Sequence, residues 1–197
     1  MAVGMYHGIR TVYNMKHVRV AKRYALALFA SSKAEGSLEH VNADAHLIRD
    51  SIEQSHDFKA VLRSPIIQSW KKKHVLEEVF EGKISIITKA FLGILCAHGR
   101  ENITEDILEQ FFVYYNEETR RVPITVTSAV ELDASGRSAI EAGIEKRYSK
   151  TPIAEYKIDP SLKGGLKVQV GDTMLDSSLR TQLEKLRDSL LHNSKSN

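Results

Sequence analysis

The hydrophobic pattern of this chain changes its period near residue 121, and this change limits the fold more than any other feature. Before it, apolar residues recur at intervals of three and four, as one face of an α-helix requires. After it, short runs alternate between apolar and other residues, as a half-buried strand requires. We therefore predict an α+β protein, with an N-terminal six-helix bundle over residues 18–118 and a small C-terminal α/β domain over residues 121–191.

The clearest helical pattern is a narrow apolar seam suited to packing against one neighbouring helix. It consists of Leu38, Val41, Ala45, Ile48 and Ile52. A first helix is predicted over residues 18–34, and a fifth over residues 85–98 with a broader stripe that stops at Gly99. That stripe consists of Ile87, Phe91, Ile94, Leu95 and His98. Residues 1–17 are expected to be a disordered N-terminal extension, and residues 192–197 a polar tail.

The second half alternates most cleanly in two places, and both are predicted to be strands. The alternating residues are Val122, Ile124, Val126, Ser128 and Val130 in one, and Leu166, Val168 and Val170 in the other. A weaker strand is predicted over residues 154–158. The charged segment Glu117–Arg121 is predicted to be a hinge between the two domains. After a turn at Gly171-Asp172, a final helix is predicted to carry Leu175, Leu179, Leu183, Leu186 and Leu190.

Charge is distributed unevenly along the chain, although the formal net charge is only +3. The first acidic residue is Glu35, and the Lys and Arg residues before it have no acidic neighbour in this stretch. They are Arg10, Lys16, Arg19, Lys22, Arg23 and Lys33. The simplest interpretation is a solvated segment leading into the first helix. The alternatives are docking to an acidic partner surface and, with less support, a targeting peptide. The run Lys71-Lys72-Lys73 is interpreted as a solvated first helical turn rather than a phosphate contact.

The sequence contains none of the patterns that we would expect of an enzyme. It has no phosphate-binding loop ending in Gly-Lys-Ser/Thr and no nucleophile elbow, and its eight histidines are scattered. The pair Gly164-Gly165 is interpreted as a bulge or a close approach of two backbone segments. The single cysteine, Cys96, excludes an intramolecular disulfide and is predicted to be a buried thiol. We therefore predict a non-catalytic protein with no metal and no cofactor.

Two other functions remain open on these observations. The basic N-terminal segment is compatible with a helical protein- or RNA-binding regulator, although the aromatic residues have core spacing instead of the exposed placement that stacking on bases needs. The Gly164-Gly165 turn is compatible with a small transferase that binds a phosphate there. The longest apolar run is far shorter than the ~20 residues of a membrane span, so contact with a membrane is expected only through a partner.

Several segments resemble the ATP synthase delta subunit family, whose mitochondrial relative is the oligomycin-sensitivity-conferring protein. One is RYALALF, from Arg23 to Phe29, in the first predicted helix. The most specific is DPSLKGGLKV, from Asp159 to Val168, which is followed by Gly171-Asp172 and by LEKL at residues 183–186. The resemblance covers about residues 18–191. It departs from the family at Glu101, where a leucine is common, and at Lys163, where an apolar residue is common.

This resemblance implies a non-catalytic stator subunit of the proton-translocating ATP synthase, which links the catalytic head to the peripheral stalk so that rotation is coupled to ATP synthesis. It implies that a groove between the first and fifth helices takes the N-terminal helix of an alpha subunit. The matching positions are Tyr24, Ala27, Leu28, Ile94 and Ala97. It also implies that the C-terminal domain meets the b-subunit stalk near Gly164, Gly165, Leu179, Leu183 and Leu186. No nucleic acid is implied as a partner, and the expected location is peripheral, on the cytoplasmic face of a bacterial plasma membrane.

Overall fold

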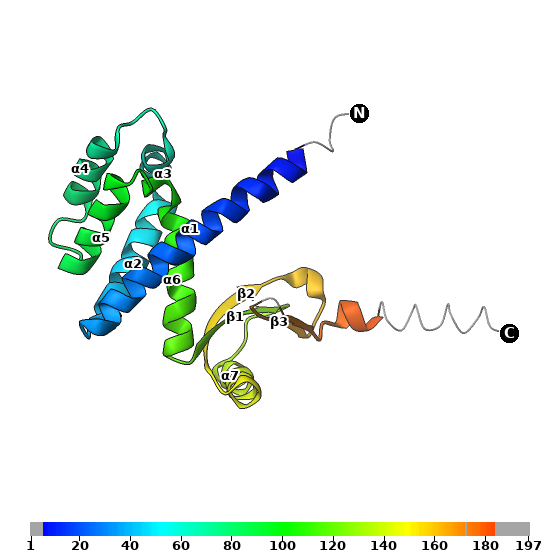
Figure 1. The fold of residues 1–197 in the computed structure, drawn as a ribbon. Helices are drawn as coiled ribbons and strands as arrows, with labels where there is room; N and C mark the ends of the chain where they lie inside the picture. Colours follow the sequence, from blue (N-terminus) through cyan, green and yellow to red (C-terminus); the bar gives the residue numbers. More distant parts are fainter. Residues whose placement is uncertain (1–5, 172, 184–197) are drawn as a thin grey trace. The chain divides into compact units, whose positions relative to one another are not determined.

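The computed structural model describes residues 6–171 and 173–183, with side chains from Val18 onward. The chain divides between Tyr115 and Asn116 into two compact units. The described residues of the first unit form helices and their connections, and the second unit holds a small mixed sheet with a helix packed against it (Figure 1). The protein is therefore α+β with an N-terminal helical region, as the change of hydrophobic period predicts.

The helices of the first unit follow one another with short connections. They are α1 (Tyr6–Ala34), α2 (Leu38–Gln54), α3 (His56–Arg63), α4 (Ser69–Val79), α5 (Ile86–Ala97), the short 3-10 helix η1 (Glu101–Ile103) and α6 (Thr104–Glu118). The first helix begins at Tyr6, before the predicted start at Val18. Residues 6–17 are thus helical rather than the disordered extension that the sequence suggested.

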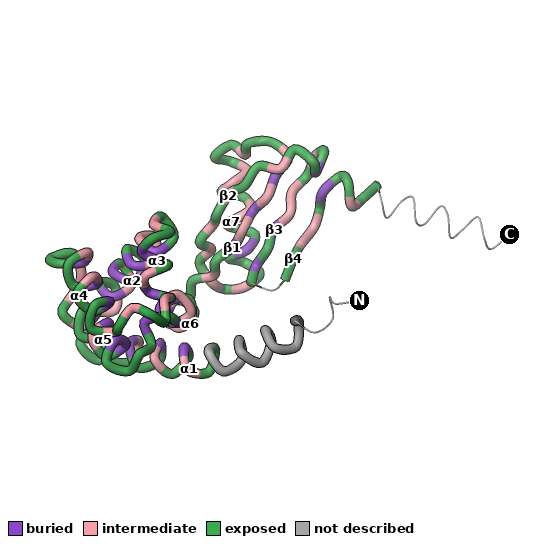
Figure 2. The backbone as a smooth tube through the Cα atoms, turned by 90° about the horizontal axis from the view of Figure 1, so that it is seen from above, coloured by how far each residue is buried: buried purple, intermediate pink, exposed green. Residues whose placement is uncertain are grey.

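The core of the first unit is built around the seam predicted on α2. Four of its five seam residues are buried, and the fifth, Leu38, packs against the core. Residues from the other helices complete this core; they include Ala21, Ala25, Leu28, Phe58, Leu62, Leu76, Phe91, Leu95, Ile107 and Phe111. Figure 2 shows the buried positions on the inner sides of these helices. Each fully buried Leu, Ile or Phe side chain contributes roughly 1.5–3 kcal/mol to the free energy of folding. The cluster therefore determines which face of each helix is buried and which face is exposed.

Helix α5 has well-defined ends, and hydrogen bonds to Asp44 anchor its start to α2. At its start the Ser85 hydroxyl accepts a hydrogen bond from the Thr88 backbone N–H at 3.3 Å. The buried Asp44 carboxylate accepts from the Ser85 backbone N–H at 2.9 Å and from the Thr88 hydroxyl at 2.7 Å. At its end Gly99 has a φ of +62°, and the Arg100 N–H bonds to the Leu95 carbonyl oxygen at 2.8 Å. The predicted stop at Gly99 is confirmed.

The prediction that Lys71-Lys72-Lys73 is a solvated turn is wrong for Lys72. Its ammonium group is buried and lies 2.8 Å from Glu101 Oε1 and 2.9 Å from the Leu62 carbonyl oxygen. Glu101 is buried as well, so the two charges form an ion pair inside the helical unit. Lys72 points inward because it is four residues before Leu76, which faces the core. Lys71 and Lys73 are exposed, as expected.

The second unit contains a four-stranded sheet in the order β2-β1-β3-β4. Its elements are β1 (Arg121–Ser128), α7 (Ala134–Tyr148), β2 (Thr151–Ile158), the short 3-10 helix η2 (Pro160–Leu162), β3 (Leu166–Val170) and β4 (Thr173–Asp176). The strands β1 and β2 are parallel and are connected through α7, whereas β3 is antiparallel to both β1 and β4. The helix covers one face, where Ile144 packs with Ile124, Val126, Val168 and Val170.

The predicted final helix begins later than the leucine spacing suggested. Leu175 lies in β4, opposite Val168 of β3, and therefore belongs to the sheet. Gly171 has a φ of +55° in the connection between the two strands, a conformation that suits glycine in a tight hairpin. Among the described residues after β4, helix begins at Leu179 and is described as far as Leu183. Leu186 and Leu190 lie outside the described residues.

Candidate protein-binding surfaces

One face of α5 is apolar, uncharged and exposed. Ile86, Ala90, Ile94 and Ala97 follow one another at steps of four, four and three residues, so they share one side of the helix. All four are exposed, and Ile86 and Ile94 keep 88% and 49% of their surface accessible. Large apolar side chains exposed together on one helix face mark a site of protein contact more often than isolated ones do. Ile94 and Ala97 were predicted from the resemblance, whereas Ile86 and Ala90 were missed.

Helix α1 lies beside this face and supplies its aromatic border. The Tyr24 ring meets the buried Phe91 ring edge-on with centroids 6.5 Å apart, and it lies 6.4 Å from the His98 ring. Tyr24 is half-buried, and Ala27, three residues further along α1, is exposed. The structure therefore brings Tyr24 next to the α5 face. The α5 face together with Tyr24 and Ala27 is called the α1/α5 surface below.

The remaining predicted residue of this group, Leu28, does not reach the surface. It is 2% exposed and belongs to the core. Leu28 follows Ala21 and Ala25 at helical spacing, and this row of α1 faces inward. Leu28 is therefore a core residue and is not part of the exposed α1/α5 surface.

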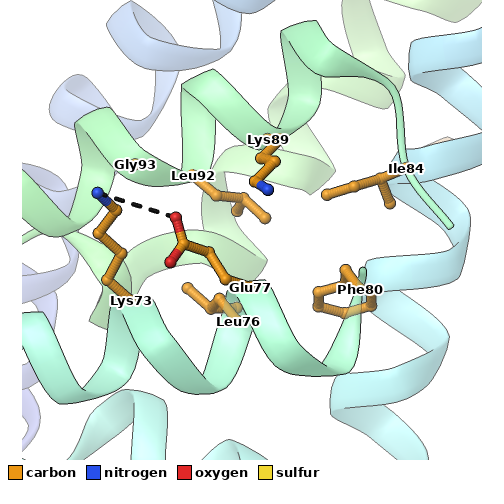
Figure 3. A pocket seen from close by; sticks show the side chains of 8 residues that line it. All are labelled: Lys73, Leu76, Glu77, Phe80, Ile84, Lys89, Leu92 and Gly93. Carbon is orange, nitrogen blue, oxygen red and sulfur yellow. Dashed lines mark ion pairs between the residues drawn. The ribbon is translucent and has the colours of Figure 1, made fainter. Parts of the chain in front are cut away.

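A hollow between α4 and α5 opens on the other edge of α5. Figure 3 shows its lining, which consists of Lys73, Leu76, Glu77, Phe80, Ile84, Lys89, Leu92 and Gly93. It encloses about 20 Å³, which is room for about one water molecule. The Lys73 ammonium lies 3.8 Å from a Glu77 carboxylate oxygen across one helical turn. The hollow is too small for a partner's side chain, so it is a gap in packing and not a ligand site.

The second candidate surface begins at the glycine pair that precedes β3. The Leu179 N–H bonds to the Gly164 carbonyl oxygen at 3.0 Å, and the Ser177 N–H bonds to the Leu166 carbonyl oxygen at 2.9 Å. A Cβ on Gly165 would lie 2.3 Å from the Ser177 carbonyl oxygen, and Gly165 has a φ of +73°. The predicted close approach of two backbone segments is confirmed. The segment after β4 occupies the place where an open phosphate cradle would be needed.

Two leucines next to this glycine pair are partly exposed. Leu179 keeps 46% and Leu183 57% of its surface accessible, while Leu186 lies outside the described residues. A Cβ on Gly164 would lie 2.6 Å from Leu179 Cδ1, so the glycine lets the leucine side chain lie against the backbone. The structure therefore brings together Gly164, Gly165 and Leu179, and Leu183 follows Leu179 one helical turn later.

Asp176 fixes the start of the helical segment that carries these leucines. Its carboxylate accepts hydrogen bonds from the Ser178 backbone N–H and from the Thr181 hydroxyl, each at 2.9 Å, and pairs with Lys167 at 3.2 Å. The bonds from Ser178 favour the charged carboxylate most and hold the pKa of Asp176 well below its usual range. The Ser178 hydroxyl in turn accepts from the Thr181 N–H at 3.3 Å, as a helix cap does.

Two further observations concern the part of the chain that the structure describes. No group of three or more His, Cys, Asp or Glu side chains in it is arranged to hold a metal ion. None of its helices combines the length and the hydropathy needed to span a lipid bilayer.

Comparison with known proteins gives one consistent result. The family model described as ATP synthase delta (OSCP) subunit matches residues 20–190. The ATP synthase subunit delta of Chlorobium luteolum is 35% identical over 176 residues, which are 89% of this chain and 97% of that protein. The same subunit of Lactobacillus gasseri is 33% identical over 175 residues, 88% of this chain and 96% of that protein. A chain in the solved structure of the Toxoplasma gondii mitochondrial ATP synthase hexamer is 25% identical with a TM-score of 0.70, covering 87% of this chain and 97% of that one.

Proposed function

This chain belongs to the ATP synthase delta (OSCP) subunit family, and from that premise we propose which of its surfaces perform the subunit's task. It is a non-catalytic stator subunit of the rotary ATP synthase, joining the catalytic head to the peripheral stalk. Rotation of the central shaft produces ATP only if the head does not turn with the shaft. The subunit must therefore hold two partners at once against a torque, which needs two binding surfaces and no reaction of its own.

The α1/α5 surface is the proposed contact with the head, where it receives the N-terminal helix of an alpha subunit. One observation carries this assignment: an uncharged face with two exposed isoleucines lies beside the Tyr24 ring on a well-packed core. An amphipathic helix laid on such a face buries its apolar stripe, which is the usual way that a helix binds a helical groove. In this proposal Tyr24, Ala27, Ile94 and Ala97 touch the partner, and Leu28 holds α1 in place beneath them.

The segment after β4 is the proposed contact with the b-subunit stalk. Leu179 and Leu183 are exposed and lie one helical turn apart. In the sequence Leu186 follows three residues later, and this spacing of leucines is typical of a segment that packs on a coiled coil. Gly164 and Gly165 support the contact indirectly, because they let the segment lie against the sheet unit.

The two contacts act together because one chain carries both. We propose that α1–α6 form a six-helix bundle that holds the head and that residues 121–191 form the domain that holds the stalk. Glu117–Arg121 is the proposed hinge between the two. Once one contact has formed, the effective concentration of the second partner rises, so two modest interfaces give a long-lived joint. The partners are proteins throughout, and the membrane is reached only through the complex.

The proposed location is the cytoplasmic face of a bacterial plasma membrane. As a subunit of the ATP synthase, the protein is associated with a membrane peripherally. The assignment to bacteria is supported by the similar subunits of Chlorobium and Lactobacillus species.

Binding to the purified catalytic head, prepared without this subunit, tests the proposal. Ile94→Asp places a charge on the α1/α5 surface at a half-exposed position and is expected to weaken head binding at least about 30-fold, close to 2 kcal/mol. Val113→Asp is the matched control, since Val113 is similarly exposed on α6. Leu183→Asp should weaken binding to the b-subunit stalk and leave head binding unchanged. Wild-type affinity of the Ile94→Asp variant for the head would refute the assignment of the α1/α5 surface.

A further inference from the structure

The exposed side of α1 carries only positive charge. The helix contains no Asp or Glu, and Arg19, Lys22 and Arg23 are all exposed. Arg19 and Arg23 are four residues apart and therefore lie in one row, about 6 Å from each other along the helix axis. We call Arg19, Lys22 and Arg23 the cationic ridge.

Nothing within the described part of the chain neutralises the cationic ridge. None of its three residues forms an ion pair with a carboxylate there. Like charges three and four residues apart repel each other and weaken a helix. The isolated protein thus carries a repulsion that an anionic partner would relieve.

The ridge borders the α1/α5 surface. The Arg23 guanidinium lies 5.6 Å from the centre of the Tyr24 ring, and that ring itself touches Phe91 of α5. The α5 side of the surface contributes no charge, because the one charged residue of α5, Lys89, lines the hollow toward α4. The surface as a whole is an apolar stripe with a positive edge on the α1 side.

We propose that the helix received by the α1/α5 surface carries carboxylates along one edge of its apolar stripe, and that the cationic ridge pairs with them. Two carboxylates four residues apart on the partner helix would match the spacing of Arg19 and Arg23. This asymmetry gives the partner helix one preferred way to lie, with its acidic edge toward α1. The inference rests on the proposed function, since it specifies the chemistry of the partner at the same surface.

Charge at the edge of an interface acts mainly on the rate of association. The ridge is exposed, so salt screens it: the Debye length falls from about 10 Å at 0.1 M salt to about 3 Å at 1 M. Head binding is therefore expected to slow markedly between these concentrations, while the apolar contact keeps the dissociation rate nearly constant.

The test measures association and dissociation rates of the full chain with the purified catalytic head at 0.1 M and 1 M NaCl. The variant R19E/R23E should associate about 10-fold more slowly than wild type at 0.1 M NaCl, and the difference should nearly disappear at 1 M. Lys71→Glu, which reverses an exposed charge on α4, is the matched control and should bind like wild type. Circular dichroism establishes that each variant is folded, and both arginines are exposed, so folding should be retained.

The outcomes separate this inference from the proposal on which it rests. If Ile94→Asp abolishes binding but R19E/R23E associates at the wild-type rate, the surface is correct and the acidic edge is wrong. If both variants bind like wild type, the assignment of the surface itself fails. If the wild-type chain sediments with phosphatidylglycerol vesicles, R19E/R23E does not, and head binding is the same for both, the ridge serves an anionic membrane and our inference is overturned.

Discussion

Replacing the buried ion pair of Lys72 and Glu101 by apolar residues should be much less harmful than breaking it. The side chains are 4% and 5% exposed, and Glu101 Oε1 accepts from Lys72 at 2.8 Å and from the Ser69 hydroxyl at 3.2 Å. The second carboxylate oxygen, Oε2, is buried without a hydrogen-bond partner. We predict that Lys72→Met and Glu101→Leu are each strongly destabilising and that the double variant is close to wild type.

The geometry of the pair sets the magnitude. At 2.8 Å and an effective dielectric constant of about 20, the attraction between the two charges is roughly 6 kcal/mol. Removing each ion from water costs several kcal/mol, so the intact pair contributes little net stability. Removal of Lys72 alone leaves a buried carboxylate bonded only to Ser69, which costs about 3–5 kcal/mol. Removal of both charges eliminates that penalty, and the double variant should range from unchanged to about 3 kcal/mol more stable.

Urea unfolding of the full chain measures these differences. Trp70 is the single tryptophan of the sequence and lies in α4, two residues before Lys72, so its fluorescence reports the helical unit alone. Lys73→Met is the control. Lys73 is exposed and forms only a weak surface ion pair with Glu77, at 3.8 Å, so this substitution should change the free energy of unfolding by less than about 0.5 kcal/mol. A double variant that loses the sum of the two single losses would refute the reasoning, as would a Lys72→Met variant with wild-type stability.

Three other predictions test local features. Variants in the second unit are followed by circular dichroism during urea unfolding, because Trp70 lies in the helical unit. Gly165→Ala should lower the free energy of unfolding by at least about 2 kcal/mol, because the backbone φ is +73° and the added Cβ would collide with backbone atoms. Gly143→Ala in α7 places its Cβ in open space and should raise the free energy of unfolding by about 0.5–1 kcal/mol. Asp44→Ala should lower the free energy of unfolding by about 2 kcal/mol, because two donors at the start of α5 lose their acceptor. Asp50→Ala, at a half-exposed position, should lower it far less. Burial raises the pKa of the Cys96 thiol to about 11, so about one molecule in a thousand is a thiolate at pH 8. Iodoacetamide should therefore modify Cys96 at pH 8 only at the rate at which the helical unit opens, and rapid labelling of the folded protein would contradict this.

The sequence predicts the helical core well because one periodic pattern encodes it. The seam on α2 faces the core as its spacing requires. Lys72 escaped prediction for the opposite reason: its partner Glu101 is 29 residues away. Three consecutive lysines look alike locally, and only the tertiary contact reveals which of them points inward. The replacement of an expected leucine by Glu101 was visible in the sequence and could have suggested a buried pair.

Leu175 shows how two patterns can overlap in one segment. It has helical spacing with Leu179 and Leu183, but it also lies in β4, where it pairs across the sheet with Val168. Pairing with β3 through the Gly171 hairpin decides in favour of the strand, because pairing beside Val168 satisfies backbone hydrogen-bonding groups and partly buries Leu175.

The sequence alone also does not show which apolar residues are exposed at the proposed head-binding surface. Leu28 and Ile94 both lie in apolar rows, and only packing shows that Leu28 is inside and Ile94 outside.

The alternation of large and small side chains on α5 suits a protein interface that must resist a force directed along the helix axis. Ile86 and Ile94 are large exposed side chains on this face, and the small residues Ala90 and Ala97 each lie one helical turn from an isoleucine. Side chains of a partner helix that pack over the alanines would interlock with the isoleucines as ridges with grooves. In the proposed complex, a partner helix that moved along α5 would have to pass the Ile94 side chain and lose that packing, whereas a flat apolar face would offer no such barrier. Phe91 and Leu95 are buried beneath this face, so if the face holds the head as proposed, torque would be transmitted to the packed helical core.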